Sequence, residues 1–114
     1  MATASVLSVL FLVVALATGQ LQPTGGVSKI NPQDSSVREI LENAVATRNS
    51  QSNEEPLRVV AVHSATSQVV SGTLYAFDYV AEGGWTGNLL NCHSEVLDQP
   101  WTNPQPQVVE HKCD

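Results

Sequence analysis

Cysteine and histidine occur close together twice near the C-terminal end of this chain, as Cys92-His93 and as His111-x-Cys113. These side chains could build a Cys₂His₂ zinc site or a cysteine–histidine catalytic pair. In a strand, however, adjacent side chains point to opposite faces, so Cys92 and His93 cannot easily share a metal ion. The spacing also lacks the C-x₂₋₄-C and H-x₃₋₅-H form of zinc sites. We therefore expect no bound metal and no cofactor.

The two cysteines predict a disulfide if the chain is exported. Residues 6–17 are all apolar except Ser8, and small residues follow them. This pattern is typical of a secretory signal peptide, and the run is too short to span a membrane comfortably, although a retained anchor is the alternative. We expect residues 1–19 to be removed, the mature chain to be secreted without a membrane segment, and Cys92 to pair with Cys113. A bonded sulfur has no thiolate, which excludes the catalytic pair.

The other titratable residues indicate no enzyme. His63 lies among Val and Ala in a segment that predicts a strand, and the pair Glu54-Glu55 lies in a polar loop. No glycine-rich phosphate loop is present. The net charge of −6 argues against a nucleic-acid partner, because no basic patch exists to neutralise phosphates.

One helix and several strands must position these residues. Residues 20–33 contain two Pro and a Gly pair, which predict a mobile arm. Ser36 and Glu39 have the spacing of an S-x-x-E capping box at a helix start. Apolar residues then recur at helical spacing, at Val37, Ile40, Leu41, Ala44 and Val45. The helix should end near residues 49–52, because a polar run and Pro56 follow.

The rest of the chain predicts strands in hairpin succession. The expected strands are residues 57–66, 73–80, 89–97 and 107–112, with breaks at Gly72, at residues 81–87 and at the Pro-rich residues 99–106. Tyr75, Phe77 and Tyr79 alternate on one face of the second strand. A lone amphipathic helix must bury its stripe on an antiparallel sheet of four to five strands, which gives one α+β domain over residues 20–114.

Three short segments carry a further pattern, namely Gly25-Gly26, residues 68–72 (QVVSG) and Pro100-Trp101. In this order, the chain resembles the cystatin family, whose signature is an N-terminal glycine, a Q-x-V-x-G hairpin loop and a Pro-Trp pair in a second hairpin. The resemblance covers the whole mature chain. The cysteines on either side of Pro100-Trp101 also resemble the C-terminal disulfide loop of secreted cystatins, and the lack of a second disulfide is similar to insect secreted cystatins.

This resemblance implies a reversible, competitive, tight-binding inhibitor of papain-like cysteine proteases, of the cathepsin L and B kind, acting as a monomer. The arm and the two loops would fill the active-site cleft, with Pro23 and Thr24 in the non-primed subsites and Gly25 turning the arm away from the catalytic thiolate. The implied protease-binding residues are Gly25, Gly26, Gln68, Val69, Val70, Ser71, Gly72, Pro100 and Trp101.

Three alternatives stay open. Apolar residues at turns indicate a binding surface, but Val70 and Trp101 could instead fold back into the core. The resemblance also places Asn53 where some cystatins bind legumain-type proteases, while Asn is equally favoured in an ordinary helix-terminating loop. Finally, the chain could be a secreted cystatin-fold binding or defence module without inhibitory activity.

Overall fold

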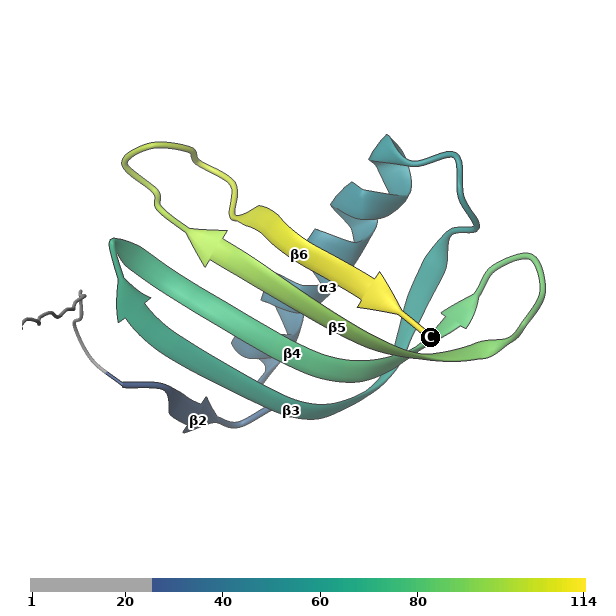
Figure 1. Ribbon diagram of the computed structural model, residues 1–114, viewed down its shortest axis with the longest axis horizontal. Coiled ribbons are helices and arrows are strands. Elements are labelled where there is room, and N and C mark those ends of the chain that lie inside the picture. Colours follow the sequence, from purple (N-terminus) through teal and green to yellow (C-terminus); the bar gives the residue numbers. More distant parts are fainter. Residues whose placement is uncertain (1–25) are drawn as a thin grey trace, which may run out of the picture.

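The computed structural model describes residues 26–114 and shows one helix packed against a five-stranded antiparallel sheet (Figure 1). The elements are β2 (Ser28–Ile30), α3 (Ser35–Gln51), β3 (Leu57–Val70), β4 (Gly72–Gly83), β5 (Leu89–Asp98) and β6 (Gln107–Cys113). The strands lie side by side in chain order, β2-β3-β4-β5-β6. This two-layer arrangement confirms the expected α+β class. The expected signal peptide, residues 1–19, lies outside the described residues.

The helix α3 begins directly after Asp34, whose carboxylate accepts the Ser36 backbone N–H at 2.9 Å and its hydroxyl at 2.7 Å. These hydrogen bonds, the Ser36 hydroxyl first, lower the pKa of Asp34. The expected capping box of Ser36 and Glu39 is therefore wrong, because Asp34 is the N-cap and Ser36 already lies in the first turn. The expected apolar stripe is confirmed: Leu41, Ala44 and Val45 are buried, and Val37 and Ile40 pack beside them.

Part of the expected arm is a strand. β2 pairs antiparallel with β3, with Ser28 opposite Ser67 and Ile30 opposite Ala65. Ile30 is half-buried and packs against the core, which ties this short segment to the sheet. The description of residues 20–33 as a wholly mobile arm is therefore wrong for residues 28–30. Among the described residues, no helix has the length and apolar character that crossing a bilayer demands.

The core lies between α3 and the inner face of the sheet. Phe77 and Tyr79 of β4 are fully buried there and Tyr75 is half-buried, which confirms the predicted alternation. β3 and β4 extend beyond their predicted ends until only Ser71 separates them. β3 and β4 are long strands, so the two ends of the sheet lie far apart.

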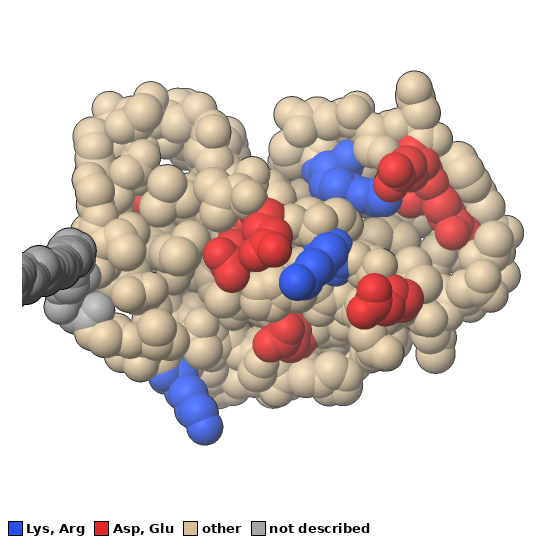
Figure 2. Space-filling model, viewed as in Figure 1, with Lys and Arg blue, Asp and Glu red and all other residues tan. Residues whose placement is uncertain are grey.

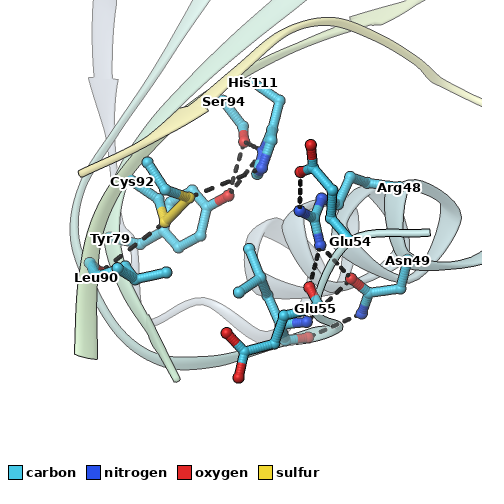
Figure 3. Close-up of a disulfide and its surroundings, with 11 residues drawn as sticks. Arg48, Asn49, Glu54, Glu55, Tyr79, Leu90, Cys92, Ser94 and His111 are labelled. Carbon is cyan, nitrogen blue, oxygen red and sulfur yellow. Dashed lines mark hydrogen bonds and ion pairs between the residues drawn. A yellow bond between two sulfur atoms is a disulfide. The ribbon is translucent and has the colours of Figure 1, made fainter. Parts of the chain in front are cut away.

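A disulfide joins the neighbouring strands β5 and β6. Cys92 lies directly opposite Cys113, and an S–S bond of 2.06 Å connects them, as the cysteine count predicts (Figure 3). Beside it the buried hydroxyls of Tyr79 and Ser94 lie 2.7 Å apart, and Nδ1 of His111 lies 3.0 Å from the Ser94 oxygen. Burial raises the pKa of the Tyr79 phenol and lowers the pKa of the His111 imidazole. Uncharged forms are thus favoured in this network.

Candidate functional site

Three segments that are far apart in the sequence meet at one end of the sheet, drawn at the left of Figure 1. They are the start of the described chain at residues 26–27, the β3–β4 turn at residues 68–72 and the β5–β6 loop at residues 99–106. We call this the loop end. The α3–β3 loop at residues 52–56 and the β4–β5 turn at residues 84–88 lie at the opposite end, which we call the far end.

The β3–β4 turn is tight and carries an exposed apolar residue. The strands stay paired up to Val69 opposite Thr73, and Gly72 has a φ of 108°, in the left-handed region that favours glycine. Val69 is 61% exposed, Ser71 is exposed, and Gln68 and Val70 are half-buried. The turn therefore presents the apolar side chain of Val69, and Ser71 beside it, to solvent.

The second loop is attached to the first. A Cβ atom on Gly72 would lie 2.5 Å from the Asp98 carbonyl oxygen, so the glycine allows the two loops to approach closely. The Gln99 side-chain amide donates a hydrogen bond to the Ser71 carbonyl oxygen. The residue pattern gave no sign of this link, because Gln99 and Ser71 become neighbours only through the register of β4 and β5, in which Thr73 lies opposite Asp98.

The β5–β6 loop has its own internal support. The backbone N–H groups of Thr102 and Asn103 both donate to the Gln99 carbonyl oxygen at 2.9 Å, which closes a turn around Pro100 and Trp101. Pro100 is exposed, and Trp101 is 67% exposed, so Trp101 does not belong to the core. A large aromatic ring held out on a closed turn can enter a pocket of a partner with little loss of conformational entropy.

The N-terminal segment approaches the same end. Because β2 runs antiparallel to β3, with Ser28 opposite Ser67, the described residues before Ser28 are directed toward the β3–β4 turn. Gly26 and Val27 are exposed, and Val27 is 63% accessible. Gly25, together with Pro23 and Thr24, lies outside the described residues, so the expectations placed on them stay predictions.

The two turns of the loop end offer uncharged groups for contact with a partner. Residues 68–72 (QVVSG) and 99–106 (QPWTNPQP) contain no Asp, Glu, His, Lys or Arg. They offer apolar side chains, uncharged amides and hydroxyls, and exposed backbone groups. Such a surface suits burial in a partner's cleft, because no charge has to be desolvated.

A family model described as the cystatin domain matches residues 25–114. The chain belongs to the cystatin family. The resemblance deduced from the residues is thereby confirmed, and cystatins as a family are inhibitors rather than enzymes.

Individual relatives are similar to this chain at modest identity. Cystatin Pr17a of Platymeris rhadamanthus is 30% identical over 77 residues, which are 68% of this chain and 63% of that protein. Kininogen-1 of Mus musculus is 30% identical over an alignment 112 positions long, which covers 81% of this chain but 16% of that protein. The chain thus spans less than two thirds of either relative. Dimeric human cystatin F has the same fold, with a TM-score of 0.64 at 19% identity, covering 82% of this chain and 89% of that one.

Asn53 lies away from the loop end of this cystatin. It is exposed in the α3–β3 loop at the far end, whereas the other candidate residues that the structure describes gather at the loop end. The Arg48 guanidinium braces the Asn53 loop, donating to the Glu55 carbonyl oxygen at 2.7 Å and to the Glu54 carboxylate at 3.0 Å (Figure 3). Asn53 and the loop end therefore form two separate candidate surfaces.

Proposed function

We propose that this cystatin is a reversible, competitive, tight-binding inhibitor of papain-like cysteine proteases, including those of the cathepsin L and B kind. The observation that carries the proposal is the pairing of two exposed apolar side chains, Val69 and Trp101, on adjoining turns at one end of a rigid sheet. Family membership supplies the class of partner. The apolar run at residues 6–17 supports secretion, so that the inhibitor would act outside the cell that makes it.

The arrangement of the two turns explains how the chain could fill the active-site cleft of a protease. Both turns project from the same end of the sheet, and the Gln99–Ser71 hydrogen bond fixes one relative to the other before any partner arrives. Preorganisation of this kind lowers the entropy lost on binding. Because β2 directs the preceding chain toward Gln68, the arm at residues 20–27 would enter the cleft beside the first turn, with Gly25 bending it away from the catalytic thiolate.

A matched pair of tryptophans gives a direct test. Trp101 and Trp85 are 67% and 69% exposed, but Trp101 lies at the loop end and Trp85 at the far end. Trp101→Ala should raise the inhibition constant for papain by roughly 30- to 1,000-fold, the usual effect of truncating an interface anchor. Trp85→Ala should leave that constant unchanged. Both variants should unfold in urea within about 0.5 kcal/mol of the parent protein, because neither side chain is in the core.

The smaller turn has its own matched pair. Val69→Ala should weaken inhibition, whereas Val109→Ala on β6, at a valine that is 54% exposed, should not. The proposal fails if the parent protein does not inhibit papain or a cathepsin L-like enzyme at micromolar concentration. That result would favour the alternative, a cystatin-fold binding or defence module without inhibitory activity. The proposal also fails if all four variants inhibit as well as the parent protein.

A further inference from the structure

The face of the sheet that points away from α3 carries a cluster of four side chains that the inhibitory function does not use. They belong to three neighbouring strands: Asp78 on β4, His93 and Glu95 on β5, and Glu110 on β6. Figure 2 shows acidic side chains among the groups on the face turned to the viewer. His93 is on this outer face because Cys92, its neighbour in the strand, points inward to the disulfide.

The two glutamates face each other directly, since Glu95 is the partner of Glu110 in the β5–β6 register. Like charges at directly opposed positions destabilise a sheet. A register shift follows immediately after Glu95, at a bulge of the kind that re-aims side chains. The Lys112 ammonium lies 3.9 Å from Glu110, but its side chain is 71% exposed, so it compensates the two carboxylates only weakly. A bound cation would relieve the repulsion.

His93 completes a set of donors. Its Nε2 atom lies 3.0 Å from the Glu95 carboxylate and 4.0 Å from the Glu110 carboxylate. One ligand atom from each of the three residues falls within 4.8 Å of the other two. Tetrahedral Zn²⁺ with bonds of about 2.0–2.2 Å places its donors about 3.3 Å apart. Rotation of the half-exposed Glu110 side chain can shorten the 4.0 Å between its oxygen and Nε2 of His93 to about this donor–donor distance.

The other ring nitrogen of His93 is already engaged. Nδ1 lies 2.8 Å from one oxygen of Asp78, and the other oxygen accepts a hydrogen bond from the Ser64 hydroxyl at 3.1 Å. Metal-binding histidines almost always donate their second N–H to such a carboxylate, which fixes the tautomer and the orientation of the ring. Without a metal ion, Nε2 donates its own N–H to the Glu95 carboxylate. Zinc would displace that proton and take the freed lone pair, which is directed toward the two glutamates.

We propose that His93, Glu95 and Glu110 bind a zinc ion on the outer face of the sheet, with Asp78 as a positioning residue. An imidazole nitrogen with two carboxylate oxygens suits Zn²⁺, whereas Ca²⁺ and Mg²⁺ prefer oxygen donors alone. Three protein donors leave the fourth position to water or to a ligand from a partner. The site shares His93 with the Cys₂His₂ set that the sequence argued against, but its other donors are the two glutamates, so it revises the expectation of no bound metal. It does not depend on protease inhibition.

Calorimetric titration of the purified, disulfide-bonded chain with Zn²⁺ tests the site, at about pH 8, which lies above the ordinary pKa of imidazole. We expect one equivalent to bind. His93→Gln and Glu110→Gln should each lower the affinity at least about tenfold, and Asp78→Asn should lower it by about 10- to 100-fold. His63→Gln is the matched control, because His63 is an exposed histidine of the neighbouring β3 segment outside the cluster, and it should bind zinc as the parent protein does.

Melting temperatures with and without zinc test the site in variants that fold less well than the parent protein. Zinc should raise the melting temperature of the parent protein and of His63→Gln but not that of His93→Gln. Absence of zinc binding by the parent protein, or binding that survives both His93→Gln and Glu110→Gln, would overturn the proposal. It would equally be overturned if Ca²⁺ bound as tightly as zinc without depending on His93. The cluster would then be an ionic bridge in which protonated His93 joins the carboxylates.

Discussion

At Gly72 the two turns of the loop end approach each other closely. The φ of this glycine, 108°, is a conformation that residues with a side chain rarely adopt. A Cβ atom there would also lie 2.5 Å from the Asp98 oxygen and 2.7 Å from Cγ of Gln99. Two independent constraints, backbone conformation and space, therefore require glycine at this position.

Gly72→Ala should lower the free energy of unfolding by about 1–3 kcal/mol, from the strained φ and the overcrowding together. Because the added methyl group pushes against Asp98 and Gln99, it should also displace the second turn and weaken papain inhibition. Urea unfolding and an inhibition titration measure the two effects. Gly26→Ala is the control for stability, since a Cβ atom at Gly26 meets nothing within 4 Å. Equal stability of the two variants would contradict this account of the turn.

At the scale of elements, Glu55 joins the α3–β3 loop to the β4–β5 turn. One oxygen of its carboxylate accepts the backbone N–H groups of Trp85 and Thr86, at 2.8 and 2.6 Å, and the Thr86 hydroxyl at 2.9 Å. These bonds, the Thr86 backbone first, lower the pKa of Glu55. A single carboxylate thus holds the exposed β4–β5 turn in place through three hydrogen bonds.

This clamp should make stability depend on pH. A carboxyl group whose pKa is lower in the folded state stabilises the protein above its ordinary pKa, and that contribution disappears as the pH falls through the folded value. Glu55→Gln should therefore melt at a lower temperature than the parent protein at neutral pH, and the gap should close below about pH 4.3. Glu39→Gln, on the exposed face of α3, should show no such gap. Melting curves across this range provide the measurement, and a gap that persists at low pH would refute the assignment.

The sequence predicted the elements better than their ends. Helical and alternating apolar spacing identified α3 and the inward face of β4, because burial imposes those periods directly. The N-cap was assigned wrongly because Asp34 and Ser36 are both good capping residues, and only the backbone decides between them. β2 was missed because three residues carry too little periodicity, and their pairing depends on β3.

The candidate site was predictable as a set of positions but not as a surface. The family pattern marked the two turns and the arm, yet the exposure of Trp101 could not be deduced, since a tryptophan is buried in most contexts. The Gln99–Ser71 hydrogen bond joins two separate turns, and the His93 cluster joins residues on different strands. Such contacts follow from strand register, and one bulge changes which side chains meet.

At the scale of the whole molecule, the long β3 strand separates two surfaces. Asn53 precedes β3 at the far end and Ser71 follows it at the loop end, with fourteen strand residues between. At about 3.3 Å per residue the separation is on the order of 40 Å, enough for a partner at each end. The Asn53 loop is also braced independently, by Arg48 and by the Asn49 side chain, which bonds both the N–H and the carbonyl oxygen of Leu57.

We propose on this basis that Asn53 contacts legumain-type proteases. One variant at each end of the sheet, measured against both legumain and papain, tests this. Asn53→Ala should weaken legumain inhibition at least about tenfold, as truncation of a central contact does, while papain inhibition stays unchanged. Trp101→Ala should show the reverse pattern. Because the surfaces are separate, gel filtration of the parent protein with both enzymes should give a ternary complex. Lack of legumain inhibition by the parent protein, or competition between papain and legumain for it, would show that the far-end loop serves only to connect α3 with β3.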